Sequence, residues 1–127
     1  PEAELYILTN GITMIQTRRF ERSSIRELIK GLFTSEQVGT PKPNKEFFDA
    51  VFASLPDFDK SKAVMIGDSL SSDIRGGINA GITTIWYNPH LKRNDLGVCP
   101  DYTATSYEQV LRILHSETGR VPPHVSV

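Results

Sequence analysis

The sequence has few of the features that mark disulfide-bonded, membrane or nucleic-acid-binding proteins. Its single cysteine, Cys99, excludes an intrachain disulfide and the cysteine-rich zinc patterns, and it favours a reducing compartment. No apolar run approaches the roughly 20 residues that a membrane-spanning helix needs, and no signal-peptide pattern opens the chain. Fourteen basic and fifteen acidic residues leave a net charge of -1. We therefore expect a cytoplasmic protein that has neither nucleic acid nor a membrane as its partner.

The length of 127 residues suits one compact domain with one apolar core. We expect this domain to span residues 1–115. The remaining residues, 116–127, show no periodicity and contain Pro122 and Pro123, so we expect a flexible tail. The chain has no initiator methionine, and a strand pattern starts almost directly after Pro1. This suggests a piece of a longer protein.

Short apolar runs alternate with helical patterns along the chain. Strands are expected at residues 5–8, 63–66, 82–87 and 102–104, with a further short strand at 32–38. Helices are expected at 44–55, 72–80 and from 105 onward, with two short ones within 12–29. This alternation predicts an α/β fold with a doubly wound parallel sheet, whose ligand site lies beyond the carboxyl ends of the strands.

Several residues predict where helices start or pack closely. Asn44 is expected to cap the helix at 44–55, and Thr105 and Glu108 have the spacing of a capping box for the last helix. Gly76 and Gly77 lie inside a helix, where each costs about 1 kcal/mol relative to alanine. Such a cost is tolerated where the helix backbone must lie very close to a neighbouring element.

The tetrapeptide Gly67-Asp68-Ser69-Leu70 permits a serine esterase interpretation. A serine hydrolase needs a histidine base and an acid that orients it. In the esterases that carry this tetrapeptide it lies near the amino terminus, and an aspartate precedes the histidine by three positions. Here the tetrapeptide lies past mid-chain, and none of the residues three before the histidines at positions 90, 115 and 124 is acidic. Ser69 is better explained as a turn residue or a helix cap.

The two acids of the same stretch permit a metal site. Asp68 follows a predicted strand and Asp73 lies in the first turn of the next helix, so the turn brings the two carboxylates close. Like charges so placed repel unless a cation or a lysine lies between them, and hard oxygen ligands suit Mg²⁺. The alternative is that both acids only serve the amino-terminal end of the helix. This stretch alone does not decide between them.

Three further residues favour the metal interpretation. Thr9 and Asn10 follow another predicted strand and are suitable hydrogen-bond donors for a phosphate oxygen. Lys42 lies between Pro41 and Pro43, whose rings restrict the backbone. Each residue alone has an ordinary explanation as a turn or a solvated side chain. Their joint placement at the ends of an alternating pattern predicts a common site.

In this order and spacing, the segments resemble motifs of the haloacid dehalogenase (HAD) superfamily of phosphohydrolases, over about residues 5–114. "YILTNG" resembles the second motif, "VGTPKPNKEFF" the third and "VMIGDSLSSDIRGGINAG" the fourth. Together with "WYNPH", they are most similar to the house-cleaning pyrimidine 5′-nucleotidases. The resemblance implies a magnesium-dependent phosphomonoesterase with a Rossmann-like core, acting on a small-molecule phosphomonoester such as a pyrimidine nucleoside 5′-monophosphate.

The resemblance also implies roles for individual residues. Thr9 would bind the transferring phosphoryl group, with Asn10 beside it. Lys42 would bind phosphate and neutralise charge on the nucleophile and the phosphoryl oxygens. Asp68 would be a magnesium ligand, and Asp73 would complete or orient the metal site.

The superfamily's first motif, Asp-x-Asp near the amino terminus, and its helical cap have no counterpart in the sequence. The first aspartate of that motif is the nucleophile that forms the phospho-aspartyl intermediate. The resemblance therefore implies the carboxyl-terminal part of a phosphatase, inactive alone, whose missing strand lies between those at 5–8 and 63–66. Without that strand, two sheet edges would face an empty slot. A noncatalytic interaction fragment and a binding module like a response-regulator receiver remain alternatives.

Overall fold

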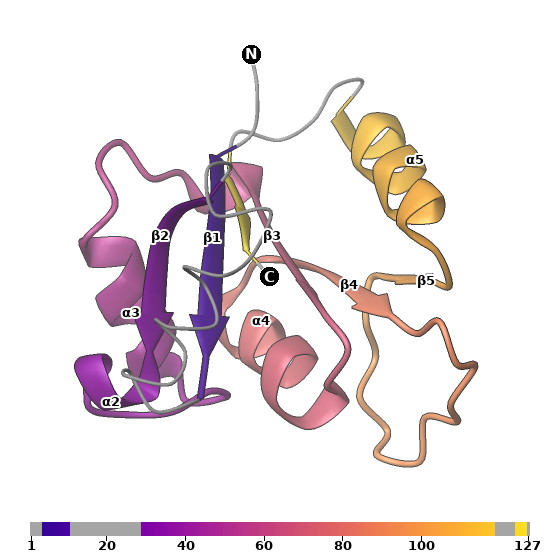
Figure 1. Ribbon diagram of the computed structural model, residues 1–127, viewed down its shortest axis with the longest axis horizontal. Helices are drawn as coiled ribbons and strands as arrows, with labels where there is room; N and C mark the ends of the chain where they lie inside the picture. The colour runs from indigo at the N-terminus through magenta and orange to yellow at the C-terminus, as the bar shows by residue number, and fades with distance from the viewer. Residues whose placement is uncertain (1–3, 11–28, 119–123, 127) are drawn as a thin grey trace.

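The computed structural model describes residues 4–10, 29–118 and 124–126, and its centre is a six-stranded parallel sheet (Figure 1). Every strand pair in the sheet is parallel, in the order β2-β1-β6-β3-β4-β5. The strands are β1 (Glu4–Thr9), β2 (Ile29–Thr34), β3 (Ala63–Gly67), β4 (Thr83–Tyr87), β5 (Tyr102–Ala104) and β6 (His124–Ser126). The expected α/β class with a parallel sheet is confirmed.

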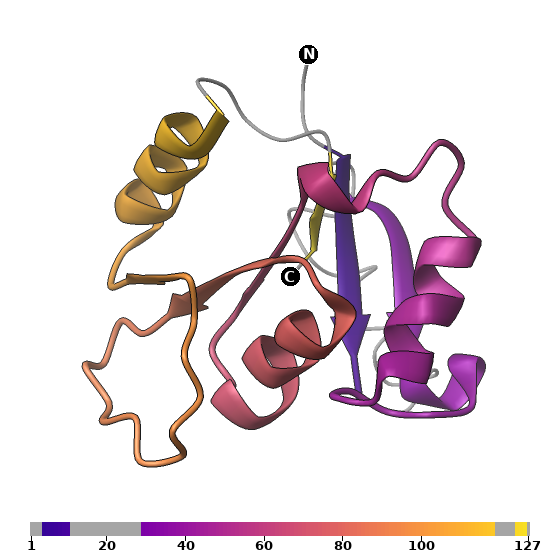
Figure 2. The ribbon, with the colours of Figure 1, turned by 180° about the vertical axis from the view of Figure 1, so that it is seen from behind.

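Helices cover both faces of the sheet. They are α2 (Ser35–Val38), α3 (Lys45–Ala53), α4 (Arg75–Ala80), α5 (Tyr107–Thr118), a 3₁₀ turn η2 (Lys60–Lys62) and a π-helical turn η3 (Leu70–Ile74). Figure 2 shows α3 and α4 together on one side of the sheet. Side chains along β3 alternate between the two faces, as strand geometry requires. Ala63 and Met65 pack with α3, whereas Val64 and Ile66 pack with α5.

The segment at 32–38 differs from its expected form. The strand begins earlier, at Ile29, and ends at Thr34, after which α2 occupies Ser35–Val38. The Thr34 hydroxyl accepts a hydrogen bond from the Gln37 amide at 3.1 Å, so this side chain starts a helix where strand pattern alone predicted continuation. The two helices expected within 12–29 lie outside the described residues, apart from Ile29, which begins β2.

Two expected side-chain caps are absent. Asn44 precedes α3, but its side chain donates to the Thr40 hydroxyl at 2.9 Å and makes no cap hydrogen bond. Before α5, the Ser106 hydroxyl accepts from the Gln109 amide at 3.2 Å, so the cap lies one residue later than Thr105. Both predictions identified the start of a helix correctly and the capping side chain wrongly.

The carboxyl-terminal residues differ from the expected tail. Helix α5 continues to Thr118, and residues 124–126 form β6 between β1 and β3. Strand β6 pairs with Glu4–Tyr6 on one side and with Ala63–Met65 on the other. The chain's own β6 therefore occupies the slot that was expected to be empty.

Gly77 in α4 lies where a side chain has no room. A β-carbon at this position would come 2.5 Å from the Thr84 methyl group and 3.1 Å from the Met65 β-carbon. We expect Gly77→Ala to lower the free energy of unfolding by about 1–3 kcal/mol, because overpacking outweighs the gain in helix propensity. Urea denaturation measures this change. The matched control is Arg75→Ala in the same helix, where the side chain is exposed and little change is expected; equal stability of the two variants would contradict the close packing.

Candidate active site

The candidate residues come from elements that end at one edge of the sheet. Thr9 is the last residue of β1, and Asn10 follows it. Asp68 follows β3, Asp73 lies in η3, and Lys42 lies in the loop between α2 and α3. Because carboxyl ends of parallel strands meet at the same edge, this topology gathers residues that are distant in the sequence.

Lys42 is the centre of this cluster. Its side chain is buried, with 8% of the residue exposed, and its ammonium nitrogen Nζ donates to Asp73 Oδ1 at 2.5 Å. The same nitrogen donates to the backbone oxygen of Leu8 in β1 at 2.7 Å. A lysine ammonium has three donors, so these contacts leave one N–H for another acceptor. The structure thus joins β1, the 39–44 loop and η3 through one cation.

Asn10 fixes the backbone of Lys42. Its Nδ2 donates to the Lys42 oxygen at 3.0 Å, and its Oδ1 accepts from the Lys42 amide at 2.8 Å. Both polar atoms of the carboxamide thus contact the Lys42 backbone, and one N–H of Nδ2 remains for another acceptor. Asn10 therefore positions Lys42, and the phosphate-binding role implied by the resemblance stays a prediction.

Asp73 is held from two sides. Its Oδ1 faces Lys42, and its Oδ2 accepts from the Ser69 amide at 3.3 Å. A β-carbon on Gly67 would overlap the Asp73 carboxyl group, so only glycine at the end of β3 permits this approach. Sequence reasoning missed this role of Gly67, although its position immediately before Asp68 was a usable signal.

Asp68 has a different environment from Asp73. It is exposed, and its carboxylate forms no hydrogen bond or ion pair with any residue that the structure describes. Its backbone oxygen accepts from Trp86 Nε1 at 3.0 Å, which fixes the main chain at this point. Asp68 is therefore the carboxylate with oxygen atoms available to an added cation.

These two acids fit part of a magnesium site. Mg²⁺ in proteins is held by one or two carboxylates and keeps several water molecules. Within residues 4–10, 29–118 and 124–126, no three His, Cys, Asp or Glu side chains lie together as a metal-binding group. Asp68 would bind the ion directly, and the contacts of Asp73 favour an orienting role over direct ligation.

Ser69 acts as a helix cap. Its hydroxyl accepts from the Ser72 amide at 3.2 Å at the start of η3, and it lies 3.4 Å from the Ser71 hydroxyl. Among the described side chains, no histidine forms a hydrogen bond with Ser69. The expectation that Ser69 is a cap and not a nucleophile is consistent with these contacts.

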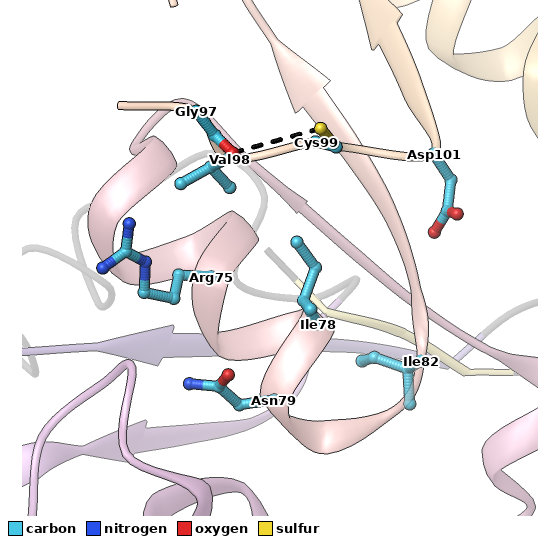
Figure 3. Close-up of a pocket in the computed structure, with 8 residues that line it drawn as sticks. All are labelled: Arg75, Ile78, Asn79, Ile82, Gly97, Val98, Cys99 and Asp101. Carbon is cyan, nitrogen blue, oxygen red and sulfur yellow. Dashed lines mark hydrogen bonds between the residues drawn. The ribbon is translucent and has the colours of Figure 1, made fainter. Parts of the chain in front are cut away.

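A cavity of about 600 Å³ lies beside α4 and contains none of the five candidate residues (Figure 3). Its walls include Arg75, Ile78 and Asn79 from α4 and residues 97–99 from the segment before β5. The lone cysteine, Cys99, is exposed here as a free thiol. Arg75 and Asp101 are the charged residues that line this cavity, and neither is one of the five candidate residues.

The described part of the chain contains no helix of the length and apolar character needed to cross a membrane.

The sequence is similar to those of known nucleotidases. The chain is 46% identical over 111 residues to the pyrimidine 5′-nucleotidase PynA of Streptococcus pneumoniae, covering 87% of this chain and 47% of PynA. It is 39% identical over 112 residues to the pyrimidine 5′-nucleotidase YjjG of Escherichia coli, covering 88% of this chain and 50% of YjjG. The chain thus spans about half the length of these relatives.

A solved structure shares the fold. The magnesium-bound putative HAD-hydrolase YfnB from Bacillus subtilis superposes with a TM-score of 0.83 at 40% identity, covering 87% of this chain and 49% of YfnB. The sequence pattern of the HAD-hydrolase-like family matches residues 39–110, which include Lys42, Asp68 and Asp73. This chain belongs to the HAD-like hydrolases.

Proposed function

We propose that these residues form the phosphate- and metal-binding part of a magnesium-dependent phosphomonoester hydrolase that acts on nucleoside 5′-monophosphates. The buried contact between Lys42 and Asp73, beside the exposed Asp68, is the observation that carries this proposal. The names of PynA and YjjG support a pyrimidine nucleotide as the substrate. The nucleophilic aspartate would come from a segment outside these 127 residues.

Lys42 supplies the fixed positive charge of the site. Its third N–H is available to an oxygen of the phosphoryl group or of the nucleophile, while Asp73 and Leu8 hold the ammonium in place. Phosphoryl transfer is catalysed mostly by positioning and by neutralising charge on the phosphoryl oxygens. A preorganised lysine does both without reorientation during the reaction.

Thr9 and Asp68 complete the proposed division of roles. Thr9 at the end of β1 contributes its hydroxyl to the phosphoryl group, and Asp68 binds the magnesium ion together with ligands from outside the described residues. When bound, Mg²⁺ would neutralise charge on the phosphoryl oxygens. The carboxylate oxygen of the nucleophile would attack phosphorus as the bond from phosphorus to the nucleoside 5′-oxygen breaks, and that oxygen would take a proton from a general acid outside these 127 residues. Water would then hydrolyse the acyl phosphate, releasing inorganic phosphate and regenerating the carboxylate.

The short length of β6 supports the proposal that a segment outside these 127 residues contributes to the site. Strand β6 pairs with three residues of β1 and three of β3, whereas β1 has six residues and β3 has five. The additional residues of both strands lie at their carboxyl ends, next to Lys42 and Asp68. A longer strand in this slot would reach the candidate site with its own carboxyl end.

The test is a phosphatase assay of the complete gene product and of the 127-residue chain, each with Mg²⁺ and with excess EDTA. We expect the complete product to hydrolyse UMP and dTMP in Mg²⁺ and to lose this activity in EDTA, because the site requires a cation. We expect the 127-residue chain alone to be inactive. Absence of magnesium-dependent hydrolysis by the complete product, over nucleotide and sugar phosphates, would contradict the proposal.

A noncatalytic interaction module is the second candidate. Strand β6 favours it, because the chain's own β6 occupies the position between β1 and β3 without a strand from another segment. The same preparations distinguish the two. A complete product of about the same mass as the 127-residue chain, folding cooperatively and inactive towards every ester, would support the second candidate over the first.

A further inference from the structure

Strand β6 fills only part of the slot between β1 and β3, and it is the short yellow strand beside β1 in Figure 1. It pairs with the first three residues of β1 and with the first three residues of β3. Beyond this pairing, β1 continues to Thr9 and β3 to Gly67. The part of the slot that β6 leaves is therefore the carboxyl-terminal part, where the Leu8 oxygen accepts from Lys42.

The slot is apolar on both of its faces. On one face, Tyr6 of β1 and Met65 of β3 belong to the buried cluster that includes residues of α3. On the other face, Leu5 of β1 packs against the cluster that contains Val64 of β3 and residues of α5. A parallel strand that is buried on both faces has a nearly continuous apolar sequence. The slot therefore fits an extended apolar segment that runs parallel to β1 and β3.

The sequence of β6 matches this slot poorly. The strand reads His-Val-Ser, so it has a single apolar residue. Ser126 is in register with Tyr6 and with Met65, which are 7% and 0% exposed. A polar residue at such a position gains little from removal of apolar surface from water. A longer and more apolar strand is therefore a stronger occupant of the slot than β6.

The walls of the slot are held by other elements than β6. Strand β1 pairs with β2 at five positions, and β3 pairs with β4 at four. Phe47 and Phe48 of α3 join Tyr6 and Met65 in one buried cluster, so α3 packs against both walls. Lys42 also connects β1 to η3. One strand can therefore leave the slot and another can enter while both walls stay in place.

We propose that this slot is a strand-exchange site: residues 124–126 cover it until an apolar strand from another segment of the complete gene product takes their place. This rests on the proposed function, in which a segment outside these 127 residues supplies the nucleophile, and it adds that this segment and β6 exclude each other. A strand of five or six residues pairs along the whole of β3 and β1, and its carboxyl end lies next to Lys42. Occupation of the slot by β6 thus keeps the site incomplete.

Disulfide formation measures how often β6 occupies the slot. Neighbouring strands lie about 4.8 Å apart, and a disulfide spans Cα separations of about 4.4–6.8 Å. In a Cys99→Ser background, we expect Leu5→Cys/Val125→Cys, a pair in register, to form a disulfide in the 127-residue chain. In the complete product this disulfide should form about tenfold more slowly or less, because its rate follows the fraction of molecules with β6 in the slot. The control Ile7→Cys/Leu32→Cys joins β1 to β2 and should react equally fast in both preparations.

Amide hydrogen exchange gives a second readout that needs no substitution. In the 127-residue chain, pairing on both sides should protect the amides of β6. In the complete product these amides should exchange about tenfold faster or more, because the segment is released from the sheet. The amide of Met65 in β3 is the internal reference and should stay protected in both preparations.

The two readouts separate this proposal from the proposed function. If the complete product releases β6 but hydrolyses no ester, strand exchange is supported and the proposed function fails. Any complete product that does form the Leu5–Val125 disulfide should hydrolyse UMP only after reduction with dithiothreitol. If the disulfide forms and the β6 amides exchange at the same rates in the two preparations, strand exchange is overturned, whether or not UMP is hydrolysed.

Discussion

Asp68→Asn should lower magnesium-dependent phosphatase activity of the complete product by about a hundredfold to a thousandfold, the range seen when one electrostatic group of a transition-state site is removed. The physical reason is that Asp68 is the exposed carboxylate next to the Lys42 cluster, and a carboxamide binds a hard divalent cation more weakly. Initial rates on UMP over a range of Mg²⁺ concentrations measure the loss and separate weakened metal binding from a slower reaction.

The fold should not depend on the Asp68 charge. Its side chain is exposed and forms no hydrogen bond with the described residues, so the unfolding midpoint in urea should be nearly unchanged. Asp57→Asn is the matched control, because Asp57 is also an exposed aspartate but precedes the amino-terminal end of β3. Full activity of Asp68→Asn in Mg²⁺, or an equal loss in Asp57→Asn, would refute the assigned role.

Lys42→Met should reduce both stability and activity. Removing the ammonium leaves the Asp73 carboxylate buried without its positive partner, which costs about 3–5 kcal/mol in comparable buried pairs. It also removes the donor to Leu8, which ties β1 to this loop. We expect a clear decrease in the urea midpoint, together with loss of phosphatase activity in whatever fraction remains folded.

A double variant separates the two effects. Lys42→Met combined with Asp73→Asn removes the unpaired charge, so it should recover part of the stability while remaining inactive. Lys45→Met is the control: its ammonium contacts Asp49 at 2.8 Å, but both side chains are about half exposed, and such surface pairs contribute little. Recovery of activity in the double variant would show that Lys42 acts only as a structural residue.

The parts of the site that follow local patterns were predictable. The apolar run before Gly67 places Asp68 at a strand end, and strand β3 confirms this position. The close packing at Gly77 was also predictable. A glycine inside a helix lowers the stability of the helix, so its presence indicates a contact that leaves no room for a side chain. The contact between Lys42 and Asp73 could not be predicted from the spacing of the two residues in the sequence, because it depends on how the 39–44 loop packs against η3.

Strand β6 shows why other parts could not be predicted. A three-residue strand has no measurable periodicity, and its structure comes from pairing with β1 and β3. The capping residue of α5 was predicted wrongly for a related reason. Thr105 and Ser106 are adjacent hydroxyl residues, and only the backbone geometry decides which hydroxyl accepts the hydrogen bond from the helix amide. Likewise, the role of Asn10 depends on a partner fixed by the folded chain.

The position of β6 has a consequence for synthesis. This strand joins β1 to β3 and follows both of them in the chain. Contacts between distant positions form late, because the entropy of closing a long loop must be overcome first. When the 127-residue chain is translated alone, β3, β4 and β5 can pair as they emerge from the ribosome, whereas β1 cannot be joined to them through β6 until residue 126 has left the exit tunnel.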